Sequence, residues 1–243
     1  MHKKIRLNAA ATAGLLIILF FLIIAVFAPV IAPYDPKEMI ASYLPPSKEH
    51  ILRTNDVGQD IFSEMVYGTR VSLYIGIFAA FIVTGVGTVL ALVSGYFGGV
   101  ADKIITAITN IAMAVPSLPL TVLLIAYLNP GKWSLIIAIS ITAWTGTARI
   151  LRARVMQLKE LPFIKIEKTM GVHPAVILFK HILPNIKDII LTRGAMAISG
   201  AMMTEAGLSF LGLGEFGEKS WGSVLHYAFF RNSIMKKQYW WYV

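Results

Sequence analysis

Long uncharged hydrophobic runs dominate the pattern of residues along the chain. A membrane-spanning helix needs roughly 20 consecutive apolar residues. Four runs reach or approach that length, and these are Leu7–Tyr34, Val71–Ala101, Ile104–Gly131 and Trp133–Ala148. A fifth apolar stretch, Ile189–Gly214, carries two charged residues, Arg193 and Glu205. The pattern therefore predicts an all-α integral membrane protein with one helix for each of these stretches.

The composition agrees with a membrane protein and excludes several other classes. Of the 243 residues, 56% are hydrophobic and 14% are charged, whereas about 25% of residues are charged in an ordinary soluble domain. A chain this apolar is not disordered. It contains no cysteine, which excludes a disulfide scaffold, thiolate catalysis and cysteine-ligated metal centres.

The distribution of basic residues predicts which parts of the chain face the cytoplasm. The net charge is +9, and residues 149–187 contain eight basic and two acidic side chains, against four basic and six acidic ones in residues 33–70. Cytoplasmic loops carry the excess of Lys and Arg. We therefore expect a cytoplasmic N-terminus and loop 149–187, and external segments at 35–70 and 215–237. No motif that reads nucleic acid accompanies these charges, so no nucleic-acid partner is expected.

These expectations divide the chain into three parts. The first is an N-terminal tail with the first transmembrane helix, residues 1–34, and the second is the external segment 35–70. The third is a transmembrane domain, residues 71–243, which includes the cytoplasmic loop 149–187. An aromatic cluster at Gln238–Val243 resembles the belt that precedes a membrane helix. We expect a sixth helix after Val243; the alternative is that the aromatic residues only anchor the tail.

Motifs for chemistry are missing from the sequence. The step Gly131-Lys132 lacks the rest of a phosphate-binding loop, because Trp133 follows it. The glycine pattern over Gly212–Gly217 has no preceding strand, so it is interpreted as the exit of a helix and not as a dinucleotide site. The histidines are scattered, and no metal cluster is expected. We predict no catalytic residue and no cofactor, so energy for uphill transport would come from another subunit.

The cytoplasmic loop has a helix–turn–helix pattern between residues 158 and 185. Gly171 suits the C-terminus of one helix, and Pro174 suits the first turn of the next. Apolar residues such as Phe163 and Met170 would be unfavourable in a loop surrounded by water. The pattern therefore predicts a short helical element that contacts an apolar partner.

The spacing of Gly171 and Leu183-Pro184 resembles the EAA motif of type I ABC importer permeases. The variant His181-x-Leu183-Pro184-Asn185 is similar to that of the dipeptide/oligopeptide/nickel permease family. Further similar segments follow one order along the chain: Pro45–Ser47, His50, Thr54–Asp60, Gly68–Leu73, Gly95–Gly99 with Asp102, Ala148-Arg149 with Arg152, and Glu205–Gly214. The chain thus resembles the second permease type of this family, which has a long segment after the first helix.

Two departures from the family pattern stand out. The external segment has Arg53-Thr54-Asn55 and Gly58-Gln59-Asp60 where the family usually has Gly-Thr-Asp and Gly-Arg-Asp. Ile166 and Glu167 occupy positions where small residues are expected before Gly171. The first departure changes details of the external surface. The second could change how tightly the loop docks on its partner.

The resemblance implies a type I ABC importer transmembrane domain in the cell membrane, with the sixth helix of the family. The implied partners are a second homologous permease, two ATP-binding subunits that hydrolyse ATP, an external solute-binding protein and the lipid bilayer. The chain itself would form the translocation path and would not be an enzyme. Its substrate would be a peptide or a related small solute, with nickel left open.

The resemblance also places the ATPase contact in the loop. The candidate coupling residues are Phe163, Glu167, Lys168, Met170, Gly171, Val172, His173, Pro174, His181, Leu183 and Pro184. Phe163, Met170 and Val172 would be its apolar anchors. Glu205 is a candidate for the translocation path because ionisable residues within a membrane are costly and often functional. The alternative, which we favour, is that Glu205 is a buried structural partner.

Two other functions compete with transport powered by partner ATPases. A membrane scaffold would use the basic loop to recruit a cytoplasmic partner without transporting anything. An ion-coupled carrier would need ionisable side chains within the bilayer, and the first four hydrophobic runs have none in their interiors. The choice among peptides, nickel and other solutes lies beyond this sequence.

Overall fold

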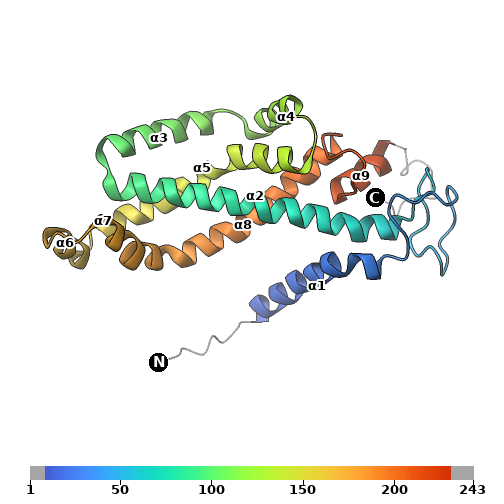
Figure 1. The fold of residues 1–243 in the computed structure, drawn as a ribbon, viewed down its shortest axis with the longest axis horizontal. Coiled ribbons are helices and arrows are strands. Elements are labelled where there is room, and N and C mark those ends of the chain that lie inside the picture. Colours follow the sequence, from blue (N-terminus) through green and yellow to red (C-terminus); the bar gives the residue numbers. More distant parts are fainter. Residues whose placement is uncertain (1–8, 231–243) are drawn as a thin grey trace. The chain divides into compact units, whose positions relative to one another are not determined.

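The structure, a computed structural model, describes residues 9–230 and is largely helical over that range (Figure 1). The helices in chain order are α1 Ala9–Ile31, α2 Ile61–Phe97, α3 Gly99–Ala114, α4 Ser117–Leu128, α5 Lys132–Lys159, α6 Pro162–Thr169, α7 Pro174–Val176, the π-helix η1 Ile177–Ile182, α8 Leu183–Phe210 and α9 Trp221–Phe230. The chain forms two compact units. The terminal unit comprises Met1–Tyr74 and Ala206–Val243, and the central unit comprises Ile75–Glu205.

Helix α2 begins ten residues earlier than the hydrophobic run that predicts it, so residues 61–70 of the expected external segment are helical. The cause is a capping residue. The side chain of Asp60 accepts a hydrogen bond from the backbone N–H of Ser63 (2.8 Å) and another from the Ser63 hydroxyl (2.7 Å). A side chain that satisfies a free N–H in the first turn favours a helix start at that point.

The run Ile104–Gly131 was expected to form one helix, but it is divided between α3 and α4, which are bent by 90° at their junction. Pro116 explains the break. A proline disfavours helical backbone in the residue before it, and Val115 is extended, with φ −85° and ψ 127°. The run predicted as one helix therefore forms a bent pair of helices, which together are apolar enough for one span.

Among the described residues, three helices are long and apolar enough to cross a membrane: α1, α2 and α5. The pair α3 and α4 makes a fourth if it counts as one span. Helix α8 is also long, with 28 residues, and contains most of the fifth predicted stretch. Charged side chains, including Arg193 and Glu205, interrupt its apolar stretch.

Within the central unit, the long helices approach closely at glycines. A Cβ atom added to Gly95 of α2 would lie 2.8 Å from the Cβ of Val155 on α5. Small residues allow helix backbones to come close together in membrane proteins, where dispersion contacts replace the hydrophobic effect. Helices α3 and α4 also pack on α5, and the guanidinium of Arg152 on α5 donates two 2.6 Å hydrogen bonds to the Asp102 carboxylate on α3.

The terminal unit is built around the start of α2 and the segment that follows α8. Ile61 of α2 packs with Val224 and Ala228 of α9, and Leu52 covers them. The ring of Phe21 on α1 meets the edge of the Trp221 ring at 5.6 Å. Part of the predicted external segment 215–237 is therefore the helix α9. The C-terminal aromatic cluster and the basic residues before α1 lie outside the described residues.

We predict that Gly95→Val destabilises the protein by about 1–3 kcal/mol, because the added methyl groups would overlap Val155. Gly85→Val is the matched control on the same helix, since nothing lies within 4 Å of an added Cβ there. The measurement is thermal or denaturant unfolding of the purified protein in detergent. Equal stabilities of the two variants would show that α2 and α5 do not pack closely at Gly95.

Candidate functional site

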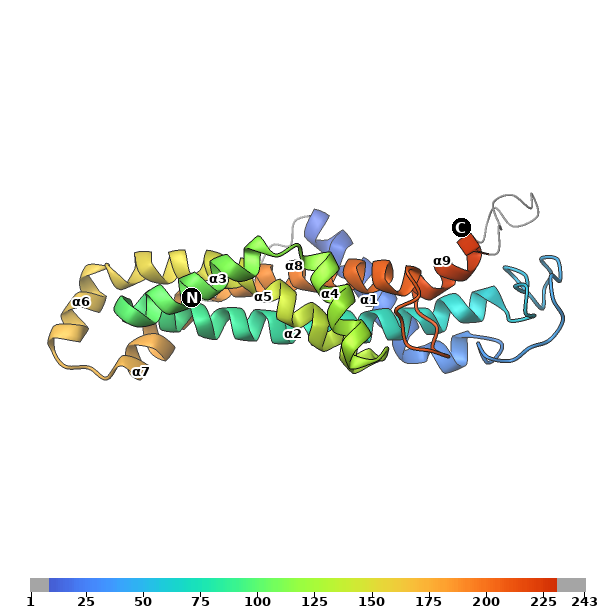
Figure 2. The same ribbon diagram turned by 90° about the horizontal axis from the view of Figure 1, so that it is seen from above.

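The loop between α5 and α8 is held by a hydrophobic core of its own. Helix α6 begins at Pro162, and Ile164 is the residue of α6 that points inward, with 2% of its surface exposed. The buried residues of this core come from α2, α5, α6, η1 and α8, and they are Ala91, Tyr96, Leu151, Val155, Leu158, Ile164, Ile177, Ile182 and Ile186. The loop is thus a folded extension of the central unit (Figure 2).

The turn after α6 is a Schellman motif. The N–H of Val172 donates to the Glu167 carbonyl (3.1 Å), and the N–H of Gly171 donates to the Lys168 carbonyl (3.2 Å). This arrangement requires a left-handed residue at Gly171, whose φ is +76°. The space around Gly171 is open, so the requirement for glycine comes from backbone conformation and not from packing. The predicted turn at this residue is confirmed.

The second half of the loop starts at Pro174, as predicted, and then widens into a π-helix. The ring Nδ1 of His173 accepts a hydrogen bond from the N–H of Ala175 (3.3 Å) and caps α7. The π-helix η1 follows directly and joins α8. Short π-helical turns are rare and often occur at functional sites. No sequence signal predicted this one.

A close polar contact links the two halves of the loop. Nε2 of His181 lies 2.8 Å from Oε1 of Glu167, so η1 is linked to α6. The rings of His181 and Phe163 also meet, with centroids 6.2 Å apart. Three of the predicted coupling residues therefore act together within the loop, where they hold its shape.

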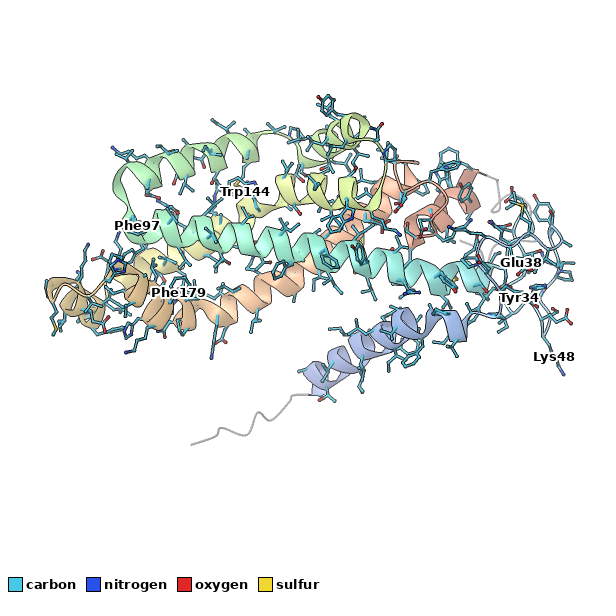
Figure 3. The ribbon with its side chains drawn as sticks, in the orientation of Figure 1. Tyr34, Glu38, Lys48, Phe97, Trp144 and Phe179 are labelled. Atoms are coloured by element: carbon cyan, nitrogen blue, oxygen red, sulfur yellow. The ribbon has the colours of Figure 1, made fainter. Side chains whose placement is uncertain are left out.

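Several large apolar side chains of the loop face outward. Phe163 is 45% exposed, Met170 is 76% exposed and Phe179 is 67% exposed. Phe179 is labelled in Figure 3. We call the five that are at least 44% exposed the loop apolar surface, and its members are Phe163, Ile166, Met170, Val176 and Phe179. Val172 does not belong to it, because its side chain is half-buried against the loop core. Ile166, Val176 and Phe179 were not predicted, since exposure within a short helix cannot be assigned without its neighbours.

Charged groups surround this surface. One of them is Lys168, which is exposed. Two uncharged candidates lie at the start of α8, where Pro184 is exposed and Leu183 is half-buried. Lys165 forms an ion pair of 2.8 Å with Glu160, and the hydrogen bond from Lys165 holds the pKa of the Glu160 carboxyl below its ordinary value. An apolar centre with charged residues around it is the usual composition of a protein interface.

Two further observations concern metal ligands and Glu205. Within residues 9–230, no group of three or more His, Asp or Glu side chains could hold a metal ion. Glu205, the candidate for the translocation path, is fully buried. Its burial agrees with the structural interpretation, in which the carboxylate is a partner inside the protein.

Comparison with known proteins identifies the family. A family model described as "Binding-protein-dependent transport system inner membrane component" matches residues 87–234, more than half of the chain. The chain belongs to this family. A second model, the N-terminal TM domain of oligopeptide transport permease C, matches residues 1–46. The chain is therefore a membrane permease subunit of an importer, and the resemblance inferred from its motifs is confirmed.

Permeases from bacteria are similar in sequence over most of this permease subunit. The oligopeptide transport system permease protein OppC of Bacillus subtilis is 39% identical over 91% of this chain and 73% of its own length. The dipeptide transport system permease protein DppC of the same organism is 35% identical over 90% and 70%. The glutathione transport system permease protein GsiD of Pectobacterium atrosepticum is 35% identical over 93% and 76%.

The fold is also similar to a solved importer. The inward-facing MetNI methionine ABC transporter matches with a TM-score of 0.57 and 18% identity, over 72% of this chain and 82% of that one. At this identity the likeness concerns the fold alone. It confirms the predicted class, an all-α type I ABC importer transmembrane domain.

We predict that Ile164→Ala destabilises the loop by about 2 kcal/mol or more, because it removes a side chain that is fully enclosed by the loop core. Ile166→Ala is the matched control, since Ile166 lies on the same helix but is 58% exposed. Hydrogen exchange of residues 160–185 measures the local stability. Faster exchange is expected in the first variant only, and equal exchange would contradict the assigned orientation of α6.

Proposed function

We propose that this permease subunit forms the translocation path of an ATP-driven peptide importer, together with a second homologous permease. The names of its relatives, which transport oligopeptides, dipeptides and glutathione, support a peptide as substrate. The observation that carries the mechanism is the loop apolar surface. Its side chains are exposed, and the loop that bears them is folded around a hydrophobic core of its own.

The loop apolar surface is proposed to dock in a groove of one of two cytoplasmic ATP-binding subunits. Phe163 and Met170 would be buried there, with Lys168 and His173 at the polar edge of the contact. An unpartnered apolar surface of this kind is costly in water, so a protein partner on the cytoplasmic side explains why it is present.

The packing of the loop explains how a movement of the ATPase could reach the membrane. Ile164 and Ile177 lie in one core with Leu151 and Val155 of α5 and with Ile186 of α8. A displacement of α6 would therefore move these long helices with it. Rigid-body movements of packed helices are a known means of alternating between conformations.

The proposed orientation follows from the basic residues. The N-terminus and loop 149–187 face the cytoplasm, and residues 35–60 face outward, where they would meet a solute-binding protein. This arrangement places ATP hydrolysis and solute delivery on opposite sides of the membrane. The complex would belong to the cell membrane, with this chain as a multi-pass subunit.

The coupling proposal predicts that the double variant Ile166→Ser, Phe179→Ser loses ATP-dependent peptide uptake. Both side chains are exposed, so the protein should fold and insert normally while the docking surface is weakened. Uptake and ATPase activity are measured in vesicles that contain both permeases, the ATP-binding subunits and a loaded binding protein. We expect uptake to fall at least tenfold, with ATPase activity no longer stimulated by the binding protein.

The double variant Ile166→Leu, Phe179→Leu serves as the control, because it keeps an apolar side chain at both exposed positions. It should leave uptake unchanged. Normal uptake in the serine double variant would contradict the coupling proposal. If the wild-type complex assembled with the ATPases but imported no solute, the chain would be a scaffold and not a permease.

The orientation is tested with single cysteines, which the natural chain lacks. Ser47→Cys should react with an impermeant thiol reagent added to intact cells, and Lys168→Cys should react only after the cells are opened. Both positions are exposed, so labelling reports the side of the membrane and not burial. Labelling of the second position in intact cells would reverse the proposed orientation.

A further inference from the structure

Helix α8 carries a cation that has no acidic side chain as partner. Within residues 9–230, the guanidinium of Arg193 makes one polar contact, from Nη1 to the Met196 sulfur at 3.9 Å. Residues 1–8 and 231–243 contain no Asp or Glu that could supply a partner. Arg193 lies six residues beyond loop 149–187, which is about 9 Å along a helix. Charged side chains at such positions in a membrane helix usually face a bundle interior or a water-filled path.

The guanidinium lies where three helices of the central unit come together. A Cβ atom added to Gly146 of α5 would lie 3.3 Å from Nη2 of Arg193. A Cβ atom added to Gly194, the next residue of α8, would lie 3.7 Å from Oγ1 of Thr84 on α2. Glycine at position 146 therefore leaves the space that the guanidinium occupies against the backbone of α5.

Polar atoms at this junction lack partners. Nε of Arg193, Oγ1 of Thr84 and Oγ1 of Thr147, the residue after Gly146, are buried without a hydrogen bond among residues 9–230. Buried polar atoms are nearly always paired in folded proteins. A guanidinium and hydroxyl groups can all donate hydrogen bonds to a carboxylate, and the guanidinium can do so with two parallel bonds. The junction therefore suits a carboxylate that this chain does not itself provide.

The guanidinium also borders an uncovered face of α8. The exposed residues of this face between positions 191 and 203 recur with the period of a helix, and we call them the α8 stripe: Leu191, Thr192, Ala195, Met196, Ser199, Gly200 and Met203. Four of them are small or carry a hydroxyl group, a composition typical of surfaces that face protein or water and not lipid. Because Nη1 contacts Met196, the cation can be reached from this face.

We propose that Arg193 binds the C-terminal carboxylate of a peptide as the peptide passes along the α8 stripe. The identity of the ligand as a peptide rests on the proposed function, while the preference for a carboxylate rests on the unpaired guanidinium and the hydroxyl groups near it. Peptides with a free C-terminus would thus be favoured over amidated ones at a step within the membrane. A carboxylate of the second permease is the competing partner, and the test distinguishes it.

The first test measures charge and access near Arg193 with a cysteine at position 196. The chain has no cysteine of its own, so Met196→Cys is its single reactive thiol. The complex of both permeases and the ATP-binding subunits is held in lipid nanodiscs and treated with methanethiosulfonates that carry either a sulfonate or a trimethylammonium group. Labelling of this chain is followed by mass spectrometry.

We expect the anionic reagent to lose about fivefold in rate relative to the cationic one when Arg193→Gln is added, because a nearby positive charge is removed. Trialanine should slow the labelling more than its C-terminal amide does. A failure of both reagents to react would place the α8 stripe against lipid or another helix. An unchanged ratio of rates would show that the guanidinium is neutralised by a partner. Either result overturns the inference.

The second test compares ATP-dependent uptake of radiolabelled trialanine and its C-terminal amide into proteoliposomes. Each probe is supplied at a concentration that loads the binding protein to the same extent, and the preference of that protein enters every variant equally. Arg193→Gln should lower the ratio of the two uptake rates about tenfold. Arg193→Lys should restore part of it, because the charge remains but the planar fork is lost.

Lys103→Gln is the matched control, since Lys103 is an exposed basic residue on α3 of the same unit, and it should leave the ratio unchanged. An equal loss of both probes in Arg193→Gln would make Arg193 a structural residue, and an unchanged ratio would remove it from the path. A wild-type complex that imports neither probe refutes the proposed function. A complex that imports both probes with a ratio independent of Arg193 refutes only this inference.

Discussion

The burial of isoleucines beneath the loop is the interaction on which the proposed mechanism depends. Ile164 from α6 and Ile177 and Ile182 from η1 meet Leu151 and Val155 of α5 in one core. Without this core, the loop would be a flexible connection with an apolar surface and could not pass a displacement to the long helices. Because the core is closely packed, a push on the exposed side chains must move α5 and α8 as well. The same isoleucines thus determine both the shape of the loop and its stiffness.

The terminal unit is organised by polar contacts instead. Asp60 caps α2, and Nδ1 of the buried His50 lies 3.1 Å from its carboxylate. Close by along the chain, Asn55 donates hydrogen bonds to Glu64 and Gln59, and Lys219 completes this group from the far end of the sequence. Buried polar groups are costly unless they are paired. Their pairing therefore ties the segment before α2 to the segment before α9.

The sequence was sufficient to predict the features that depend on local chemistry or on length. Hydrophobic runs located the long helices, and Gly171 and Pro174 located the turn and the second helix of the loop. Pro116 marks the bend between α3 and α4, but a proline inside a hydrophobic run does not by itself distinguish a kinked helix from two helices. Exposure could not be predicted in the same way. Val172 and Ile166 are both apolar and lie six residues apart, yet only the packed structure shows that Val172 turns inward and Ile166 outward.

The residues that depart from the family pattern in the loop have definite places in the structure. Ile166 adds an apolar side chain to the exposed surface. Glu167 reaches His181 and joins α6 to η1, while its backbone carbonyl accepts the hydrogen bond that closes the turn at Gly171. A small residue at position 167 would leave the backbone bond intact and remove the contact with His181. The larger residues therefore extend the surface that we propose to dock on the ATPase, and they link the two halves of the loop, as the proposed mechanism requires.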